Sequence, residues 1–255
     1  GTQDRYEGRF NINSFKGARQ LSLIGMGNNT NAEGFSFMDM LNFSGDMGRT
    51  AQGGGNMNII MNQGDQNAPN QGSGSNNSIN TTWAGGVNYN DLIGTKLDFR
   101  SNYFYNRFSP RTESRLERQY ILPDSGYFYL QDAVSNAINN TQRFNAILDY
   151  AIDSFHSIRF SPSIGWQDTR RSTESRYQTL SENSELTNEG FNNTSTENKG
   201  YNLRNDLLFR KKFRKRGRTF STALQYLQNS SNGSGNQFSV NDFYLPSGLP
   251  AGTDS

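Results

Sequence analysis

The sequence predicts an all-β fold: an antiparallel transmembrane β-barrel segment of about eight meandering strands, joined by short turns and long external loops. Three observations predict it. Apolar and polar residues alternate with a period of two, the connections between the alternating segments are short and long in turn, and the composition is polar yet rich in aromatic residues. Alternation with this period places one set of side chains on each face of a strand.

The alternating segments define the expected strands. In segment 143–152, for example, Phe144 and Leu148 fall on one face and Asp149 falls on the other. Each segment is long enough to cross a bilayer, because a tilted transmembrane strand needs about 9–11 residues. The expected strands lie near residues 5–14, 20–28, 79–90, 96–107, 143–152, 157–167, 200–210 and 219–228.

The connections predict the topology. Short ones near residues 15–19, 90–95, 153–156 and 211–218 suit hairpin turns, and Lys16-Gly17 and Ile93-Gly94 are typical turn pairs. Long ones, rich in Asn, Ser, Gly and Thr, are expected as loops at 29–78, 108–141, 168–198 and 229–255. Short turns on one side and long loops on the other are typical of outer-membrane barrels.

The composition narrows the classes of protein to which the chain could belong. The chain has 255 residues, 32% of them hydrophobic, with 18 Phe and 12 Tyr, and disordered chains are poor in aromatics. No run of about 18 apolar residues predicts a membrane helix, and the polar, charged start at residues 1–10 does not read as a signal peptide. With no Cys and a single histidine, His156, we expect no disulfide, no metal site and no catalytic triad. A net charge of +2 does not suggest nucleic-acid binding.

Charged residues lie in mid-strand on the face opposite the apolar one, and a soluble sandwich could also expose them to water. In a large barrel they would line a wet lumen, where they would select solutes or pair across strands. A soluble β-sandwich with an aromatic core is the alternative, but its loops would be unusually long. The expected lumen-lining residues are Arg9, Asp98, Arg100, Arg143, Asp149, Arg159, Arg204 and Asp206.

The direction of the turns predicts a part of a larger barrel. Each short turn joins an odd strand to the next even one, so the chain would enter and leave on the long-loop side. Bacterial barrels normally keep both termini in the periplasm. We therefore expect a slice of a larger barrel.

Four stretches carry a family resemblance: residues 5–13 (RYEGRFNIN), 20–31 (QLSLIGMGNNTN), 34–45 (GFSFMDMLNFSG) and 83–91 (WAGGVNYND). With them, the chain resembles the β-barrel region of TonB-dependent-receptor-like outer-membrane proteins of Bacteroidota, which are related to SusC-like transporters. The resemblance implies a large barrel with an N-terminal plug that imports nutrients with energy from an inner-membrane complex. The chain shows no plug, no coupling box and no terminal strand ending in an aromatic residue, as expected of a fragment.

Two further segments are candidate sites. All six Met lie between Met26 and Met61, and this apolar external loop would fold into the lumen, form a lid, meet a partner protein or pack on itself. Its key residues are Phe35, Phe37, Met38, Met40 and Phe43. The basic run 210–218 (RKKFRKRGR) is interpreted as a hairpin turn at the periplasmic rim beside lipid headgroups. Nucleic-acid binding is the alternative, but stacking aromatics are not interleaved through the run.

These observations predict a multi-pass outer-membrane receptor or transporter that takes up a nutrient through a polar lumen. The first alternative is a non-transporting scaffold barrel whose loops bind partner lipoproteins, and the second is a secreted soluble β-adhesin. The expected partners are outer-membrane lipid, an inner-membrane energy-coupling complex and a surface lipoprotein, without nucleic acid or cofactor. No spacing of acidic residues indicates a catalytic pair, so an enzyme is not expected.

Overall fold

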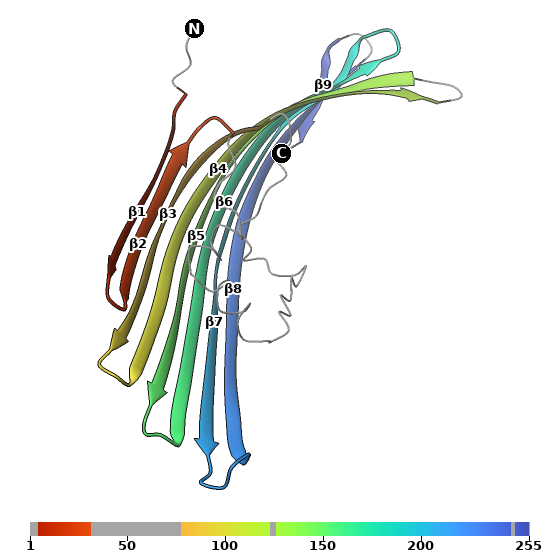
Figure 1. Cartoon of the computed structure of the whole chain (residues 1–255). Coiled ribbons are helices and arrows are strands. Elements are labelled where there is room, and N and C mark those ends of the chain that lie inside the picture. The colour runs from red at the N-terminus through yellow and green to blue at the C-terminus, as the bar shows by residue number, and fades with distance from the viewer. Residues whose placement is uncertain (1–4, 32–77, 123–125, 246–247, 255) are drawn as a thin grey trace.

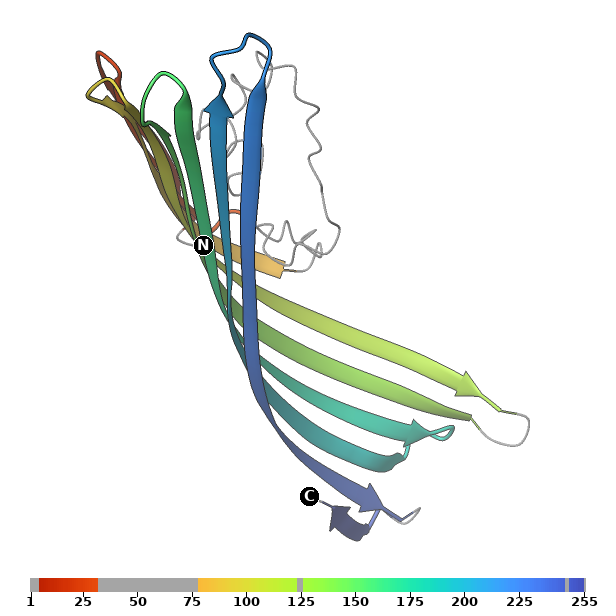
Figure 2. The ribbon, with the colours of Figure 1, turned by 90° about the horizontal axis from the view of Figure 1, so that it is seen from below.

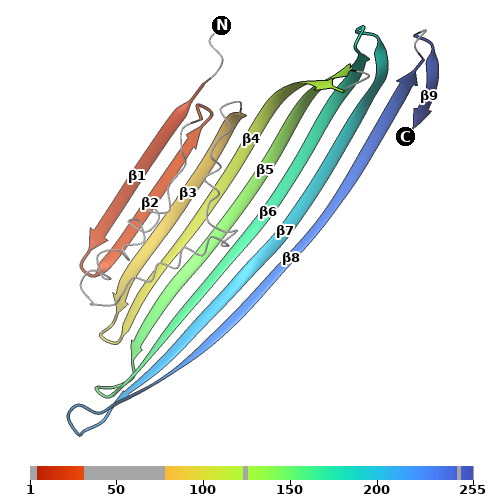
Figure 3. The ribbon, with the colours of Figure 1, turned by 90° about the vertical axis from the view of Figure 1, so that its right-hand side faces the viewer.

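The chain forms a single antiparallel sheet in the computed structural model, which describes residues 5–31, 78–122, 126–245 and 248–254. The nine strands of these residues lie side by side in chain order, and the described residues contain no helix (Figures 1 and 3). The strands are β1 (Glu7–Lys16), β2 (Arg19–Asn28), β3 (Ser78–Ile93), β4 (Leu97–Ile121), β5 (Gly126–Ala151), β6 (His156–Ser181), β7 (Leu186–Lys212), β8 (Thr219–Tyr244) and β9 (Pro250–Asp254).

The register gives each face of the sheet its character. Leu97 of β4 lies opposite Tyr150 of β5, which lies opposite Ile158 of β6. One residue along, Asp98 lies opposite Asp149, which lies opposite Arg159. Because paired residues share a face and successive residues alternate, the first row belongs to one face and the second row to the other. We call these the apolar face and the polar face.

The sheet is open and strongly bent. Its outermost strands, β1 and β9, do not pair with each other, and Figure 2 shows the long strands bending along their length. The hairpins are also staggered: β2 pairs with β3 as far as Gln20 and Asn90, whereas β3 pairs with β4 as far as Ile93 and Leu97. A stagger of this kind tilts the strands, as the wall of a barrel requires.

The prediction of a loop at 108–141 is wrong. β4 continues to Ile121 and β5 starts at Gly126, and the two remain in register through pairs such as Arg111 with Asn136. The β4 half of this extension is largely polar on both faces. On β5, Phe128, Leu130, Val134 and Ile138 share the apolar face with Asp132 and Asn136, so the alternation of apolar and polar residues is interrupted there. Strand pairing persists because the backbone hydrogen bonds of the hairpin do not depend on an apolar face.

The predictions of loops at 168–198 and 229–255 are also wrong, because strands continue through these polar segments as well. β6 extends to Ser181 and β7 begins at Leu186, while β8 extends to Tyr244 and is followed by β9, a strand that the sequence did not predict. The long connections are therefore extended strands with short turns. The expected loop at 29–78 falls largely on residues 32–77, which lie outside the described residues.

Apolar side chains gather on one side of the sheet rather than between two sheets. The soluble-sandwich alternative required two stacked sheets enclosing Phe, Leu and Trp, but the described strands form one sheet. A small buried cluster does lie on the polar face at β2–β4, formed by Ile24, Met26, Ala84 and Phe104. Larger apolar residues of the other face, such as Leu224 and Trp83, are about half exposed or more.

Candidate functional site

The apolar face carries a continuous band in the half of the sheet that ends at the β1–β2, β3–β4, β5–β6 and β7–β8 turns. The band crosses β1 to β8, and many of its side chains are exposed although they are apolar, among them Ile12 at 57% and Leu224 at 67%. Exposed apolar patches of this extent mark a surface that contacts lipid or protein. Its members include Phe10, Ile12, Leu21, Leu23, Val87, Phe99, Tyr103, Phe144, Leu148, Ile158, Phe160, Ile164, Leu203, Leu207, Phe209, Phe220 and Leu224.

The height of the band matches a bilayer core. On β6 the apolar-face positions run from Ile158 to Trp166 and are then followed by Asp168 and Arg170. That stretch is about the 9–11 residues of a tilted transmembrane strand. β6 itself continues to Ser181, so the band covers only part of the strand.

Aromatic residues border the band on the side away from those turns. Tyr105 of β4, Trp166 of β6, Tyr201 of β7 and Tyr226 of β8 stand at this border, and on β5 Gln142 lies opposite both Tyr105 and Trp166. On β3 the border residue is Trp83, whose ring centroid lies 5.5 Å from that of Tyr6. Rings that are apolar at one end and polar at the other favour a membrane–water interface.

The tyrosine hydroxyls at the border contact polar side chains rather than apolar ones. Tyr103 Oη donates to Gln142 Oε1 at 3.1 Å, and Tyr226 Oη donates to Gln228 Oε1 at 3.0 Å. Tyr201 Oη in turn accepts a hydrogen bond from Gln228 Nε2 at 2.9 Å. The border is therefore a graded transition from apolar rings to amides.

Two glycines of β2 make room for aromatic rings on the apolar face. The Phe10 ring lies over Gly25, and the Trp83 ring lies over Gly27, where a Cβ would stand 2.5 Å from the ring carbon Cζ3 of Trp83. Neighbouring rings thus cover backbone that has no side chain of its own. The apolar band therefore continues across these glycines.

Charged side chains follow immediately beyond the border. Glu197 accepts Lys199 Nζ at 2.6 Å and Arg170 Nε at 3.1 Å. The hydrogen bond from Lys199 lowers the pKa of the Glu197 carboxyl below its ordinary value. A hollow of about 540 Å³ straddles this transition, with Tyr105 and Trp166 on one side and Arg107 and Lys199 on the other.

The polar face holds all the expected lumen-lining charges, including Arg143, which belongs to the same alternation on β5. Their centre is Asp149, which accepts Arg159 Nε at 2.6 Å and Arg159 Nη2 at 2.9 Å. Arg100 Nη2 reaches the same carboxylate at 2.7 Å, and Arg100 Nε lies 3.3 Å from Asp98. This network joins β4, β5 and β6.

The other polar-face charges pair within one strand. Arg9 lies 3.3 Å from Glu7, and Arg204 lies 2.7 Å from Asp206, which also accepts Gln225 Nε2 at 2.8 Å. Of the two interpretations of these charges, pairing is observed, partly across strands and partly along them. Their role in a lumen stays a prediction.

Amides and hydroxyls connect the charges on the same face. Asn145 Nδ2 donates to Asn102 Oδ1 at 2.9 Å, and Ser163 Oγ donates to Asn145 Oδ1 at 2.7 Å. Asn102 lies two residues from Arg100 and Asn145 lies two residues from Arg143, on the same face. The polar face is therefore a hydrogen-bonded surface suited to contact with water or a polar solute.

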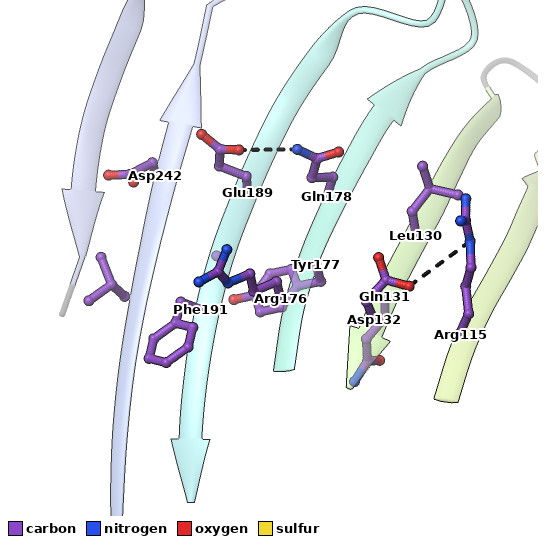
Figure 4. A pocket seen from close by; sticks show the side chains of 12 residues that line it. Arg115, Leu130, Gln131, Asp132, Arg176, Tyr177, Gln178, Glu189, Phe191 and Asp242 are labelled. Atoms are coloured by element: carbon purple, nitrogen blue, oxygen red, sulfur yellow. Dashed lines mark hydrogen bonds and ion pairs between the residues drawn. The ribbon is translucent and has the colours of Figure 1, made fainter. Parts of the chain in front are cut away.

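The strand extensions carry a second hollow that sequence reasoning missed. It measures about 470 Å³ and lies on the apolar-face alternation, far beyond the band (Figure 4). Arg176 stands 5.9 Å above the Phe191 ring centroid, Gln178 Nε2 lies 3.3 Å from Glu189 Oε2, and Arg115 lies 4.0 Å from Asp132. The adjacent Tyr244 hydroxyl donates to Glu189 at 2.6 Å, and this hydrogen bond raises the pKa of Tyr244.

A period-two charge pattern could have revealed the extensions. Arg111 pairs with Glu113 at 2.9 Å, and Arg115 pairs with Glu117 at 2.9 Å. Residues two apart share a face only in an extended chain, so opposite charges at this spacing indicate a strand even without apolar residues. The pair Asp168 and Arg170 repeats the pattern on β6 at 3.6 Å.

The basic run lies at the tip of the β7–β8 hairpin, as the rim interpretation requires. Phe213 N donates to Arg218 O at 3.0 Å and closes the turn, and Gly217 takes a φ of 81°. The expected apolar-loop residues Phe35, Phe37, Met38, Met40 and Phe43 lie outside the described residues.

Comparison of the chain with protein-family models and with curated proteins gives no match to either. Among the described residues, no helix has the length and hydropathy needed to cross a membrane. In the same part of the chain, no group of three or more His, Asp and Glu side chains could hold a metal ion.

Proposed function

We propose that this chain forms part of the wall of an outer-membrane β-barrel of the receptor or transporter type, through which a polar nutrient passes. One observation carries the proposal: a single sheet exposes a band of transmembrane height on one face and an ion-paired polar surface on the other. In a bilayer the band contacts acyl chains, the aromatic border lies at the headgroups, and the polar face lines water.

The energetics favour lipid over water for the band. Burial of apolar surface contributes about 25 cal/mol per Å², so an exposed row of Phe, Leu and Ile across many strands is costly in water. The paired charges of the opposite face are suited to a wet lumen, because lumen-facing substitutions in such barrels tune selectivity. A soluble adhesin would leave the band uncovered, so we rank it last.

The two tryptophans provide the test of membrane insertion. Trp83 and Trp166 are the only Trp residues of the chain, and both stand at the border of the band. After reconstitution into vesicles, we expect bromine atoms placed high on the acyl chains to quench Trp fluorescence more than bromines placed near the bilayer centre. The single-Trp variants Trp83→Phe and Trp166→Phe separate the two positions. Absence of quenching by either lipid contradicts the membrane proposal.

Passage through the polar face needs its own test. In planar bilayers, Asp149→Asn and Asp206→Asn make the polar face more positive and should shift the ion selectivity of the conductance toward anions. Asp132→Asn, in the strand extension on the other face, is the matched control and should leave selectivity unchanged. Unaltered selectivity in the polar-face variants, or no conductance at all, contradicts passage and leaves the membrane-wall proposal to the quenching experiment.

The strand extensions favour a second candidate, a scaffold barrel that binds a partner lipoprotein. β4 to β8 continue well beyond the band, and the hollow at Arg176 and Phe191 lies on this projecting part. Arg and aromatic residues are enriched where proteins bind one another. Arg176→Ala should weaken capture of a partner lipoprotein without changing conductance if the scaffold function is correct.

A further inference from the structure

We propose that the tip of the β7–β8 hairpin, together with the neighbouring β5–β6 turn, binds the headgroups of anionic lipids in the leaflet at that end of the sheet. This inference rests on the proposed membrane location and adds a lipid class and a site to it. The tip lies at the same end of the sheet as the β1–β2, β3–β4 and β5–β6 turns (Figure 1).

The first observation is an excess of positive charge. The hairpin carries Arg210, Lys211, Lys212, Arg214, Lys215, Arg216 and Arg218. No ion pair connects any of them to a carboxylate within the ranges that the structure describes. The nearby Asp153 is already engaged, since it accepts the backbone N–H groups of Phe155 and His156 and lies 2.9 Å from His156 Nδ1.

The second observation is the place of these cations relative to the band. On β7 the band reaches Phe209, and on β8 it begins at Phe220, so the basic residues occupy the connection between two membrane-facing positions. Basic clusters next to a membrane-spanning segment are attracted to anionic lipid by about 1 kcal/mol per residue, which corresponds to about fivefold in affinity.

The third observation is a set of exposed phenylalanines beside the cations. Phe155, Phe213 and Phe220 are exposed by 42%, 45% and 51%. Lys211 Nζ lies 5.3 Å from the Phe213 ring centroid. Aromatic rings next to cations suit a headgroup region, where the rings reach the acyl boundary and the cations reach the phosphates.

The site spans two connections and has a defined backbone. Lys212 N donates to Phe155 O at 2.7 Å and joins the two tips, while Arg218 N donates to Lys215 O at 3.3 Å within the turn. Four cations on the closed turn and three at the end of β7 present their charges together. A duplex nucleic acid would also attract this charge, but the adjoining apolar band and the exposed rings favour a lipid.

The test uses native mass spectrometry of the full chain with equal amounts of phosphatidylglycerol and phosphatidylcholine. The tip variant replaces Lys212, Arg214, Lys215 and Arg216 by Gln. The control variant replaces Arg111, Arg115, Arg118 and Arg171 by Gln, which removes the same charge from the strand extensions at the other end of the sheet. We expect the ratio of bound phosphatidylglycerol to phosphatidylcholine to fall by about tenfold or more in the tip variant and to change little in the control.

Three results of the lipid-binding experiment would overturn the inference, and a fourth would come from tryptophan quenching. A tip variant that keeps the wild-type ratio, or a wild-type chain that shows no preference for phosphatidylglycerol, removes the site. Displacement of the bound lipid by a short duplex DNA at equal concentration assigns the tip to nucleic acid instead. Tryptophan quenching by brominated lipids is measured on the same variants: quenching with no lipid preference refutes only the headgroup site, whereas loss of quenching in the wild type refutes the membrane proposal and this inference with it.

Discussion

At the scale of single residues, Asp149 is the centre of the polar face. It accepts hydrogen bonds from two arginines on neighbouring strands, Arg100 and Arg159, and its side chain is only 25% exposed. Replacing the carboxylate by an amide leaves two guanidinium groups close together without an anion between them. The network is therefore expected to contribute more to the free energy of unfolding than an isolated surface ion pair does.

The first prediction concerns Asp149→Asn. The variant should lose about 1–3 kcal/mol of unfolding free energy, because two partly buried donors lose their charged acceptor. Urea denaturation in detergent micelles measures the change. Asp132→Asn is the control. The Asp132 side chain is 75% exposed and its ion pair with Arg115 is long, at 4.0 Å, so the effect on the unfolding free energy should stay within about 0.5 kcal/mol. Equal midpoints for the wild type and Asp149→Asn contradict the prediction.

Asp153 predicts a pH dependence at the β5–β6 turn. The backbone N–H of Phe155, assisted by His156, lowers the pKa of Asp153 from its ordinary value of 3.8. A lowered pKa in the folded chain means that the ionised carboxylate stabilises the turn above the ordinary pKa and that this contribution is lost as the pH falls through the folded value.

The second prediction follows from that sign. Asp153→Ala should lower the denaturation midpoint relative to the wild type at neutral pH, and the difference should shrink as the pH is taken below 3.8. Denaturant titrations at a series of pH values measure it. A difference that grows on acidification would mean that the carboxylate does not hold the turn in its ionised form.

At the scale of elements, the turns impose backbone conformations. Gly94 sits in the β3–β4 turn with a φ of 63°, a region that residues with a Cβ avoid. The third prediction is that Gly94→Ala destabilises the fold by about 1 kcal/mol. Gly8→Ala in β1 is the control, since no atom lies within 4 Å of the added Cβ and no positive φ is involved, and it should be neutral or slightly stabilising. The same loss in both variants would mean that the turn conformation is not the cause.

The hairpin extensions give the fourth prediction. Residues 108–121 of β4 and 126–141 of β5 form a paired ladder, so their amides should exchange with solvent slowly, like those of a strand. Hydrogen exchange measured by mass spectrometry tests this, with residues 214–217 of the β7–β8 turn as a fast-exchanging internal reference. Exchange in the extensions as fast as in that turn would restore the interpretation of 108–141 as a loop.

How much of each strand could be predicted from the sequence depends on the residue pattern that its two faces leave. The strands of the band were predictable because a sheet with one apolar and one polar face leaves an alternation of Phe, Leu or Tyr with Arg, Asp or Asn, as in 143–152. The extensions were not, because on β4 Thr112, Ser114 and their neighbours are polar on both faces, and on β5 Asp132 and Asn136 interrupt the apolar face. Two weaker signals remained: the alternating charges from Arg111 to Glu117, and the apolar residues at even positions from Phe128 to Ile138.

The candidate site was predicted in part for a similar reason. The polar-face positions of Arg100, Asp149 and Arg159 follow from parity alone, since every second residue of a strand shares a face. Their mutual pairing depends on the register between β4, β5 and β6, which alternation does not specify. The hollow at Arg176 and Phe191 joins side chains of two paired strands in a region expected to be a loop, so no pattern in the sequence indicated it.

At the scale of the whole molecule, one sheet presents two chemically different faces. The band, its aromatic border and the charged zone beyond it follow one another along the strands. Opposite the band, the other face is polar apart from the small buried cluster at β2–β4. The proposed wall between lipid and water requires such a two-sided surface, and the basic hairpin and the long extensions lie at opposite ends of it.

The most direct measurement is cysteine scanning along β6, since the chain contains no natural Cys. Single cysteines at successive positions from 157 to 170 are placed in the chain reconstituted in vesicles and exposed to a water-soluble maleimide. We expect labelling at alternate positions, with Ser161 and Ser163 sites reactive and Phe160 and Ile164 sites protected up to Trp166, and labelling on both faces from Asp168 onward. Uniform labelling along the strand, or protection of the polar-face positions instead, would contradict the membrane-wall proposal.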